Sequence, residues 1–349
     1  MPSARPPVRP SALVVQTAFL GDVVLTTPLL AAIAERHGRV DVVTTPAAAG
    51  LLETHPAVGA VLRYDKRGAD RGLAGLWRLG RALRARKYER VYLPHRSWRS
   101  AALAILSGAR EQIGFADSPA AATYTRRVPR AARGHEVERL LALAGEPGAP
   151  VHAPPVSLAL TADDRAQADA WLRNHNVGDG FVAMAPGSIW GSKRWPGYAA
   201  LAAALEQPVV VVGGREDAML AETVVGAASG RVHSAAGALG LRASAALIAR
   251  AAVLVTNDSA PLHLATAVGT PIVAVFGPTV PALGFGPRGP RDVVVEHPSL
   301  ACRPCSAHGP QVCPLGHHRC MRELSVEAVH AAVAAVLGME AQPAIRTGN

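Results

Sequence analysis

The sequence predicts an α/β protein made of two doubly wound, Rossmann-like domains. Three observations predict it: a β-α alternation up to residue 143, the same alternation from residue 163 onward, and a Gly- and Pro-rich segment at 145–155 between them. Each strand candidate is a short apolar run followed by a turn and a helical pattern, which is typical of buried parallel sheets. We therefore expect domains at 1–155 and 156–324, followed by a terminal helix at 325–338.

The first domain opens with a strand at 11–16, the loop TAFLGD and a helical pattern at 23–36. Further strands are expected at 40–45, 58–64 and 90–94, and further helices at 72–87, 100–106 and 134–143. The helix at 72–87 is the densest basic element of the chain. It carries Leu73, Leu76, Leu79, Ala82 and Leu83 on one face and Arg71, Arg78, Arg81, Arg84 and Arg86 around the other.

In the second domain, strands are expected at 181–185 and 205–213 and helices at 163–174, 218–228 and 243–250. A strand at 253–255, a helix ending near Val268 and a strand at 272–276 then form a β-α-β unit. Its turn from Asp258 to His263 follows a strand, where open α/β sheets bind ligands, and a helix N-terminus there favours a phosphate. A plain helix cap at Asp258 and Ser259, with a buried His263, would give the same pattern.

Length and composition indicate a globular protein. With 349 residues and 49% hydrophobic residues, the chain can form two domains, each with its own core. The basic, proline-rich start leads into only a short apolar run, so we expect no secretory signal. The chain has no apolar run of 18 residues, the length that predicts a membrane span.

Positive charge is concentrated in the first domain. Residues 1–140 hold 22 Lys and Arg against 11 Asp and Glu, a net of +11, whereas the rest holds 14 against 15, a net of −1. This asymmetry favours an acidic partner: nucleic acid, an anionic membrane surface, or a phosphorylated or carboxylated substrate. The turn with His95, Arg96 and Arg99 follows a strand and is a candidate lining for an anionic acceptor. Solvated arginine-rich faces remain the alternative for both features.

A dinucleotide dehydrogenase is not favoured. The one GxGxxG run, at 284–289, follows no immediate strand, opens no helix and contains Pro287 where the backbone must donate. The chain also has no Walker A sequence.

Four stretches resemble a known family in the same order along the chain: AFLGDVVLTTP, PGSIWGSKRWP, TNDSAPLHLA and VFGPT. They are similar to the ADP-heptose:lipopolysaccharide heptosyltransferases of glycosyltransferase family 9, particularly the heptosyltransferase II branch. Ala260 stands where the family usually has Gly. The resemblance implies a GT-B fold, with an acceptor domain and an ADP-sugar domain facing across a cleft. It also implies a terminal helix that packs back on the first domain.

The resemblance also implies residue roles. Asp22 is the expected general base of an inverting transfer, although its position also suits a helix cap that would depress its pKa. Lys193 and Arg194 are expected to compensate the leaving ADP, with Lys193 counted as catalytic. The remaining donor-binding residues are expected to be Glu216, for which Asp217 is an alternative, and Asp258, Ser259, Ala260, His263 and Thr279. We expect no cofactor, because the chain has no Asp-x-Asp to hold a metal to a nucleotide sugar.

All four cysteines lie in one segment. Cys302, Cys305, Cys313 and Cys320 form C-x2-C-x7-C-x6-C, interleaved with His308, His317 and His318. This set could hold a structural zinc, or the four residues could be reduced thiols in a loop. The spacing does not decide between these two.

The function expected from the resemblance is transfer of L-glycero-D-manno-heptose from ADP-heptose to heptosyl-Kdo2-lipid A in lipopolysaccharide biosynthesis. The enzyme would be cytoplasmic and peripheral at the inner face of the inner membrane, with no nucleic acid as partner. Alternatives are a family-9 relative with another acceptor or sugar, including a first-heptose enzyme, and a nucleotide-sugar epimerase of GT-B architecture. A nucleic-acid-binding protein would use the charge alone.

Overall fold

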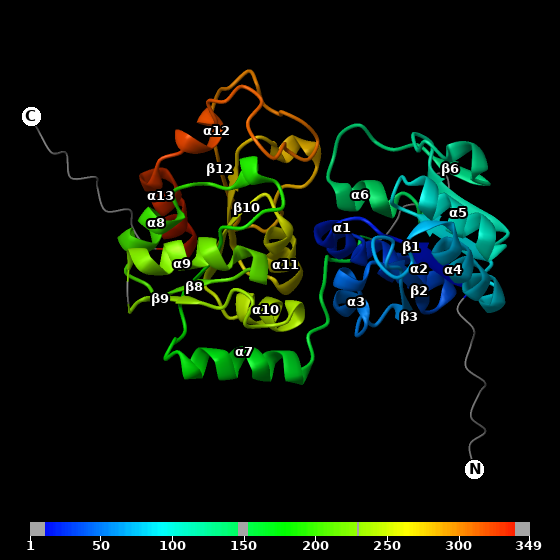
Figure 1. Cartoon of the computed structure of the whole chain (residues 1–349), viewed down its shortest axis with the longest axis horizontal. Coiled ribbons are helices and arrows are strands. Elements are labelled where there is room, and N and C mark those ends of the chain that lie inside the picture. Colours follow the sequence, from blue (N-terminus) through cyan, green and yellow to red (C-terminus); the bar gives the residue numbers. More distant parts are fainter. Residues whose placement is uncertain (1–10, 146–152, 229, 339–349) are drawn as a thin grey trace, which may run out of the picture. The chain divides into compact units, whose positions relative to one another are not determined.

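The computed structural model describes residues 11–145, 153–228 and 230–338. The chain divides into two compact units between Ala159 and Leu160, close to the boundary expected at residue 155. Each unit contains a six-stranded parallel sheet with helices (Figure 1). Residues 146–152 of the expected linker lie outside the described residues.

The strands of the first unit run in the order β3-β2-β1-β4-β5-β6, which is the order of a Rossmann fold. These strands are β1 (Ala12–Val15), β2 (Val40–Thr44), β3 (Val58–Arg63), β4 (Arg90–Leu93), β5 (Glu111–Phe115) and β6 (Arg126–Val128). The helices are α1 (Leu20–Leu25), α2 (Thr27–His37), α3 (Pro46–Leu52), α4 (Gly72–Arg86), α5 (Trp98–Ser107) and α6 (Glu136–Leu141). The direction of winding reverses between β1 and β4, so loops leave this point toward opposite sides.

The helix expected at 23–36 is two helices, α1 and α2, because of Pro28. Proline has no N–H to give the carbonyl four residues earlier. That carbonyl, Val24 O, instead accepts from the Thr27 hydroxyl at 2.8 Å, and the Thr26 hydroxyl donates to Asp22 O at 2.7 Å. The first helix also begins earlier than expected, at Leu20, which places Asp22 inside its first turn.

The second unit repeats the same plan. Its order β12-β11-β10-β7-β8-β9 reads, from the other edge, as the first unit's order, with the reversal between β7 and β10. The strands are β7 (Val182–Ala185), β8 (Val209–Val211), β9 (Val232–Ser234), β10 (Val253–Asn257), β11 (Ile272–Phe276) and β12 (Val293–Glu296). The helices are α7 (Ala162–Asn174), α8 (Tyr198–Ala204), α9 (Ala218–Ala227), α10 (Leu241–Ile248), α11 (Ala260–Val268), α12 (Arg319–Arg322) and α13 (Val326–Leu337).

The terminal helix α13 packs within the second unit, where it contacts α8 and the strands β10, β11 and β12 (Figure 1). Val329, Val333 and Val336 of this helix join the same hydrophobic cluster as Val273 and Val275 of β11. The expected packing of this helix on the first domain stays a prediction. The apolar face of α13 is already covered by the sheet that precedes it in the chain.

No helix within the described parts of the chain is long and apolar enough to cross a membrane.

Candidate functional site

The first candidate site lies at the carboxyl end of the second sheet, at the strands β7 and β10. The two strands are neighbours, so the loops that follow them begin next to one another at the carboxyl end of the sheet. Asn257, fully buried at the end of β10, joins these loops: its Nδ2 donates to Pro186 O at 2.8 Å and its Oδ1 accepts from Trp195 N at 3.2 Å. The Gly- and Ser-rich loop 186–194 is thereby fixed beside the N-terminus of α11.

Lys193, Asp258 and Thr279, three of the predicted donor-site residues, lie together here and contact one another. Lys193 Nζ donates to Asp258 Oδ2 at 2.6 Å and to Asp258 O at 3.1 Å. The Thr279 hydroxyl donates to the same carboxylate oxygen at 2.7 Å. All three residues are buried. A lysine ammonium has three N–H donors, so one donor beyond these two contacts is available to a ligand.

Ser259 is the N-cap residue of α11, and its side chain does not cap the helix. The Ser259 Oγ atom is buried and has no hydrogen-bond partner among the described residues. The Asp258 carboxylate is likewise engaged by Lys193 and Thr279 rather than by the helix N–H groups. The simple cap interpretation therefore fails, and an unsatisfied hydroxyl lies where a helix N-terminus favours an anion.

Other predicted donor residues surround this point. Ala260 is the first residue of α11, and His263 lies buried on the same helix, with its ring centroid 6.4 Å from that of Phe285. Arg194 is exposed, and its Nη2 and Nε donate to Ser188 O at 2.8 and 3.0 Å, which braces the loop.

Glu216 is exposed in the turn after β8, whereas the neighbouring Asp217 is partly buried. Asp217 Oδ2 accepts from Gly214 N at 3.0 Å, and burial raises the pKa of the Asp217 carboxyl. A Cβ at Gly187 would lie 2.2 Å from Asp217 Oδ1, so the Asp217 carboxylate packs directly against the Gly187 backbone. Asp217 thus lies next to the loop after β7, while the Glu216 side chain faces solvent.

Sequence reasoning missed Arg303, which holds the turn containing Thr279. Its guanidinium donates to Gly277 O, to Phe276 O at 3.2 Å and to Thr279 O at 3.0 Å, and it pairs with Glu296 at 2.7 Å. An arginine inside a cysteine-rich segment shows no periodicity, so the sequence offered no signal for this role.

The cysteine segment supports both loops of the site. Cys305 N donates to Pro278 O at 2.8 Å, and His318 Nε2 lies 2.7 Å from Ser192 O. Cys302, Cys305, Cys313 and Cys320 are free thiols, and burial raises the pKa of Cys320 to about 11. Within the described ranges, no three His, Cys, Asp or Glu residues are grouped so as to hold a metal ion.

A second candidate site lies at the carboxyl ends of β1 and β4 in the first unit. Thr17 Oγ1 lies 3.2 Å from His95 Nδ1, and Lys66 Nζ donates to Thr17 O at 2.7 Å. Burial, with the positive charges of Lys66 and Arg96, lowers the pKa of His95 to about 4. His95 is therefore neutral near pH 7 and offers a hydrogen bond rather than the positive charge expected of a basic turn.

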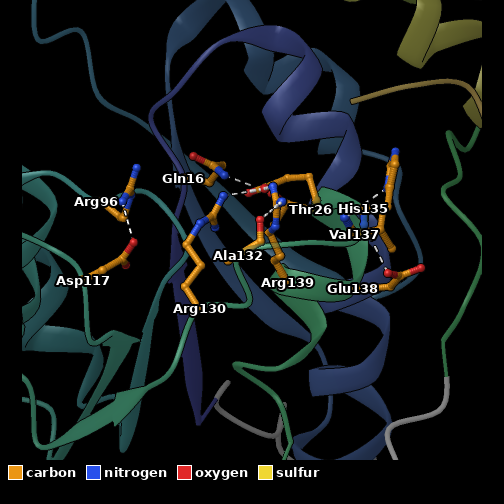
Figure 2. A network of polar contacts seen from close by, with 11 residues as sticks. Gln16, Thr26, Arg96, Asp117, Arg130, Ala132, His135, Val137, Glu138 and Arg139 are labelled. Atoms are coloured by element: carbon orange, nitrogen blue, oxygen red, sulfur yellow. Dashed lines mark hydrogen bonds and ion pairs between the residues drawn. The ribbon is translucent and has the colours of Figure 1, made fainter. Parts of the chain in front are cut away.

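The two arginines of this turn differ in their contacts. Arg96 forms an ion pair with Asp117 at 2.6 Å, and both side chains are about half exposed (Figure 2). Arg99 lies exposed in the first turn of α5. Lys66, which the sequence reading did not select, adds a cation: burial and the charges of Arg67 and Arg99 lower its pKa.

Asp22 lies in the first turn of α1, where its Oδ2 accepts from Phe19 N at 3.1 Å. The expected depression of its pKa is wrong in direction. Burial outweighs the Phe19 N–H and raises the pKa of Asp22 from 3.8 to about 6. A carboxylate with a pKa near 6 is ionised at neutral pH and is a stronger base than an ordinary aspartate.

A buried ionic cluster accompanies Asp22 in the same unit. Arg130 and Arg139 pair with Glu136 at 2.5 and 3.4 Å, and Arg139 Nη2 also donates to Ala132 O at 3.1 Å. Figure 2 shows Arg130 and Arg139 in this network, together with Gln16 at the end of β1. The charge of Glu136 raises the pKa of Asp22 and that of Arg130 lowers it. Asp22 is therefore electrostatically coupled to two groups that the sequence analysis did not select.

Comparison with known proteins identifies relatives of this chain. A model of glycosyltransferase family 9 (heptosyltransferase) matches residues 76–313. Lipooligosaccharide heptosyltransferase 2 of Campylobacter jejuni subsp. jejuni serotype O:6 is 39% identical over 77 residues, which covers only 22% of this chain and 23% of the relative. Lipopolysaccharide heptosyltransferase 2 of Escherichia coli K12 is 26% identical over 299 residues, covering 77% of this chain and 83% of the relative.

Solved structures show the same fold. A glycosyl transferase family 9 protein from Veillonella parvula DSM 2008 superposes with a TM-score of 0.83 at 25% identity, covering 93% of this chain and 96% of that chain. The E. coli ADP-heptose lipopolysaccharide heptosyltransferase II superposes with a TM-score of 0.77 at 22% identity, covering 94% and 98%. These likenesses, with the two parallel sheets, confirm the predicted GT-B fold class. Since the family model matches more than half of the sequence, the chain belongs to glycosyltransferase family 9, the heptosyltransferase family.

Proposed function

We propose that this protein is an inverting heptosyltransferase that moves L-glycero-D-manno-heptose from ADP-heptose to heptosyl-Kdo2-lipid A. The observation that carries the proposal is the Ser259 hydroxyl, buried without a partner at the N-terminus of α11 beside Lys193. In the proposed complex this hydroxyl, the α11 N–H groups and the third Lys193 donor bind the ADP diphosphate. Family membership and the ADP-heptose named for the E. coli structure support heptose as the sugar.

The donor residues then act on the leaving group. Negative charge grows on the diphosphate as the bond from the anomeric carbon to ADP breaks. Lys193 compensates this charge, and Asp258 and Thr279 hold the ammonium in place. Arg194 lies exposed at the end of the same loop and adds a second cation, while Glu216 or Asp217 binds the ribose. The family resemblance supports this assignment, and no metal or other cofactor takes part in the proposed step.

Asp22 is the proposed general base. It accepts the proton of the acceptor hydroxyl as that oxygen attacks the anomeric carbon from the face opposite ADP, which inverts the configuration. The raised pKa of Asp22 supports the role, because a base with a pKa near 6 accepts a proton more readily than an ordinary carboxylate.

The acceptor carries lipid A phosphates and Kdo carboxylates, which suits the basic first unit. His95, Arg96 and Arg99 are the proposed acceptor contacts, with His95 as a neutral hydrogen-bonding group. The enzyme works in the cytoplasm as a peripheral protein at the inner face of the inner membrane, where this lipid-linked acceptor is presented. Nucleic acid is not a partner in this proposal.

The test measures ADP release by the full chain with ADP-heptose and a panel of lipopolysaccharide acceptors truncated at successive sugars. We expect release only when the acceptor ends in its first heptose. Ser259→Ala should weaken ADP affinity by about tenfold to a hundredfold, since a hydrogen bond to a charged group contributes roughly 1.5–3 kcal/mol. Thr223→Ala removes an exposed hydroxyl that donates to Met219 O, and as the control it should leave ADP affinity unchanged. Equal ADP release without acceptor, or with every acceptor, would refute the assignment.

A further inference from the structure

Helix α4 exposes apolar side chains that its own core does not use. Leu73 and Trp77 lie one turn apart and are 82% and 56% exposed. Leu83 of the same helix is fully buried in the core of the first sheet, so the core-facing side of α4 is a different one. The sequence analysis grouped Leu73 with Leu83 on one apolar face, but Leu83 is buried whereas Leu73 is exposed. Single exposed apolar residues are common on protein surfaces, whereas two large ones together on one helix indicate a surface that binds another molecule.

These side chains form one wall of an apolar groove between α4 and α5, helices that lie beside one another (Figure 1). The helices approach closely at Gly80, where a Cβ would come within 2.6 Å of Leu106 Cβ. The groove has a volume of about 470 Å³ and is open to solvent. Its lining is entirely apolar and consists of Leu73, Ala74, Leu76, Trp77 and Leu106.

Helix α4 and its N-cap residue carry arginines without acidic partners. Arg78 pairs with Asp70 and Arg86 with Asp41, whereas Arg71, Arg81 and Arg84 form no ion pair within the described part of the chain. The Arg81 guanidinium lies 5.0 Å from the centre of the Trp77 ring, so one cation stands over the aromatic wall of the groove. Leucine and tryptophan beside unpaired arginines match the two layers of a membrane surface, acyl chains below and anionic headgroups above.

We propose that the face formed by the α4/α5 groove and Arg71, Arg81 and Arg84 docks the first unit on a bilayer of anionic phospholipid. Leu73 and Trp77 enter the boundary between headgroups and acyl chains, and the arginines contact phosphates around them. This inference rests on the proposed function, because it supplies the membrane contact that an enzyme with a lipid-linked acceptor needs. It differs from a purely electrostatic contact in that part of the binding is apolar.

The experiment is flotation of the full chain with vesicles of phosphatidylglycerol and phosphatidylcholine, without donor or acceptor. Wild type should bind the anionic vesicles and not pure phosphatidylcholine. Leu73→Ser should weaken binding about tenfold or more, since burying a leucine contributes roughly 1.5–3 kcal/mol, and the loss should persist in high salt. Met219→Ser is the matched control, because Met219 is also 82% exposed but lies on α9 of the second unit. It should leave binding unchanged.

The charged part of the face is tested separately. Arg81→Gln with Arg84→Gln should weaken binding at low salt by about fivefold for each arginine, and this loss should shrink as salt is added. Equal effects of Leu73→Ser and Met219→Ser, or equal binding to neutral vesicles, would overturn the proposal. A wild-type dimer that Leu73→Ser converts to monomer would overturn it as well, because the groove would then bind a second copy.

Vesicle binding and transferase activity fail independently. The variant Leu73→Ser should keep its wild-type rate on an acceptor dispersed in detergent, since it touches neither candidate site. A protein that binds vesicles but never releases ADP would refute the proposed transferase and leave the docking face standing.

Discussion

Replacing Asp22 by Asn separates the helix-terminal role of this residue from its chemical role. Asparagine keeps the size of the side chain, and its Oδ1 still accepts from Phe19 N, the contact that Asp22 Oδ2 makes at 3.1 Å. It cannot take a proton from a hydroxyl. The substitution therefore removes a charge and a base while leaving the local geometry in place.

The pKa of Asp22 sets the size of the effect on stability. Burial raises this pKa from 3.8 to about 6, a difference of about two units, or about 3 kcal/mol of unfolding free energy. The native state holds the proton more tightly than the unfolded state, so this stabilising contribution is complete below about pH 4 and lost as pH rises through about 6. Relative to wild type, Asp22→Asn should thus gain up to about 3 kcal/mol above pH 6 and little below pH 4.

Two assays check the reasoning. Urea unfolding of both proteins at about pH 4 and about pH 7.5 should give the pH-dependent gain, and its absence would mean that Asp22 is not buried as described. Turnover should fall roughly 10²- to 10⁴-fold in the variant, because a positioned base is lost. A variant that is more stable yet keeps more than about a tenth of the wild-type kcat would show that Asp22 is a partly buried helix-terminal carboxylate and not the base.

Three further predictions concern neighbours of the two sites. In wild type, kcat/KM should fall as pH drops below about 6, where Asp22 becomes protonated. In Arg130→Gln this acid side of the pH profile should move to higher pH, because a cation that lowers the pKa of Asp22 is gone. An unmoved acid side would exclude Asp22 as the group that titrates there. Lys193→Met should destabilise the fold by about 3–5 kcal/mol, as measured in urea, since it leaves the Asp258 carboxylate buried and unpaired. Arg303→Gln should raise the KM for ADP-heptose, because the turn with Thr279 loses its brace, with acceptor KM unchanged; equal rises in both would contradict a local role.

Much of the fold could be predicted because buried parallel strands are nearly continuous apolar runs. The unit from β10 to β11 is such a case: VLVTN and IVAVF are wholly buried, and the polar turn between them sits at the carboxyl edge as predicted. Strands β5 and β6 were missed, since EQIGF and RRV carry polar and charged residues, and β6 is also an edge strand of its sheet. An edge strand has a neighbouring strand on one side only, so it is less buried and its sequence is less apolar.

The partners of charged groups could not be predicted in the same way. Sequence motifs selected Lys193 and Asp258, but not their ion pair across 65 positions of the chain. The pKa of Asp22 was predicted in the wrong direction, because its environment depends on tertiary burial and on Glu136 and Arg130, which a helix-terminal position does not reveal. Arg303 reaches back to the turn after β11 from a segment without secondary structure.

The sequence also could not predict which apolar residues of a helix are buried and which are exposed. Helical periodicity placed Leu73 and Leu83 on one face of α4, yet Leu83 is fully buried and Leu73 is 82% exposed. The core-facing stripe of a helix is narrower than the range of apolar positions, and the sheet beneath decides which of them are covered.

Mass spectrometry of the glycolipid product is the direct test of heptosyl transfer to this acceptor. The full chain is incubated with ADP-heptose and an acceptor that ends in its first heptose, and the acceptor is weighed before and after. We expect a mass gain of one heptose residue with wild type and a strongly reduced gain with Asp22→Asn. An acceptor of unchanged mass, with ADP-heptose consumed or not, would contradict heptosyl transfer to this acceptor.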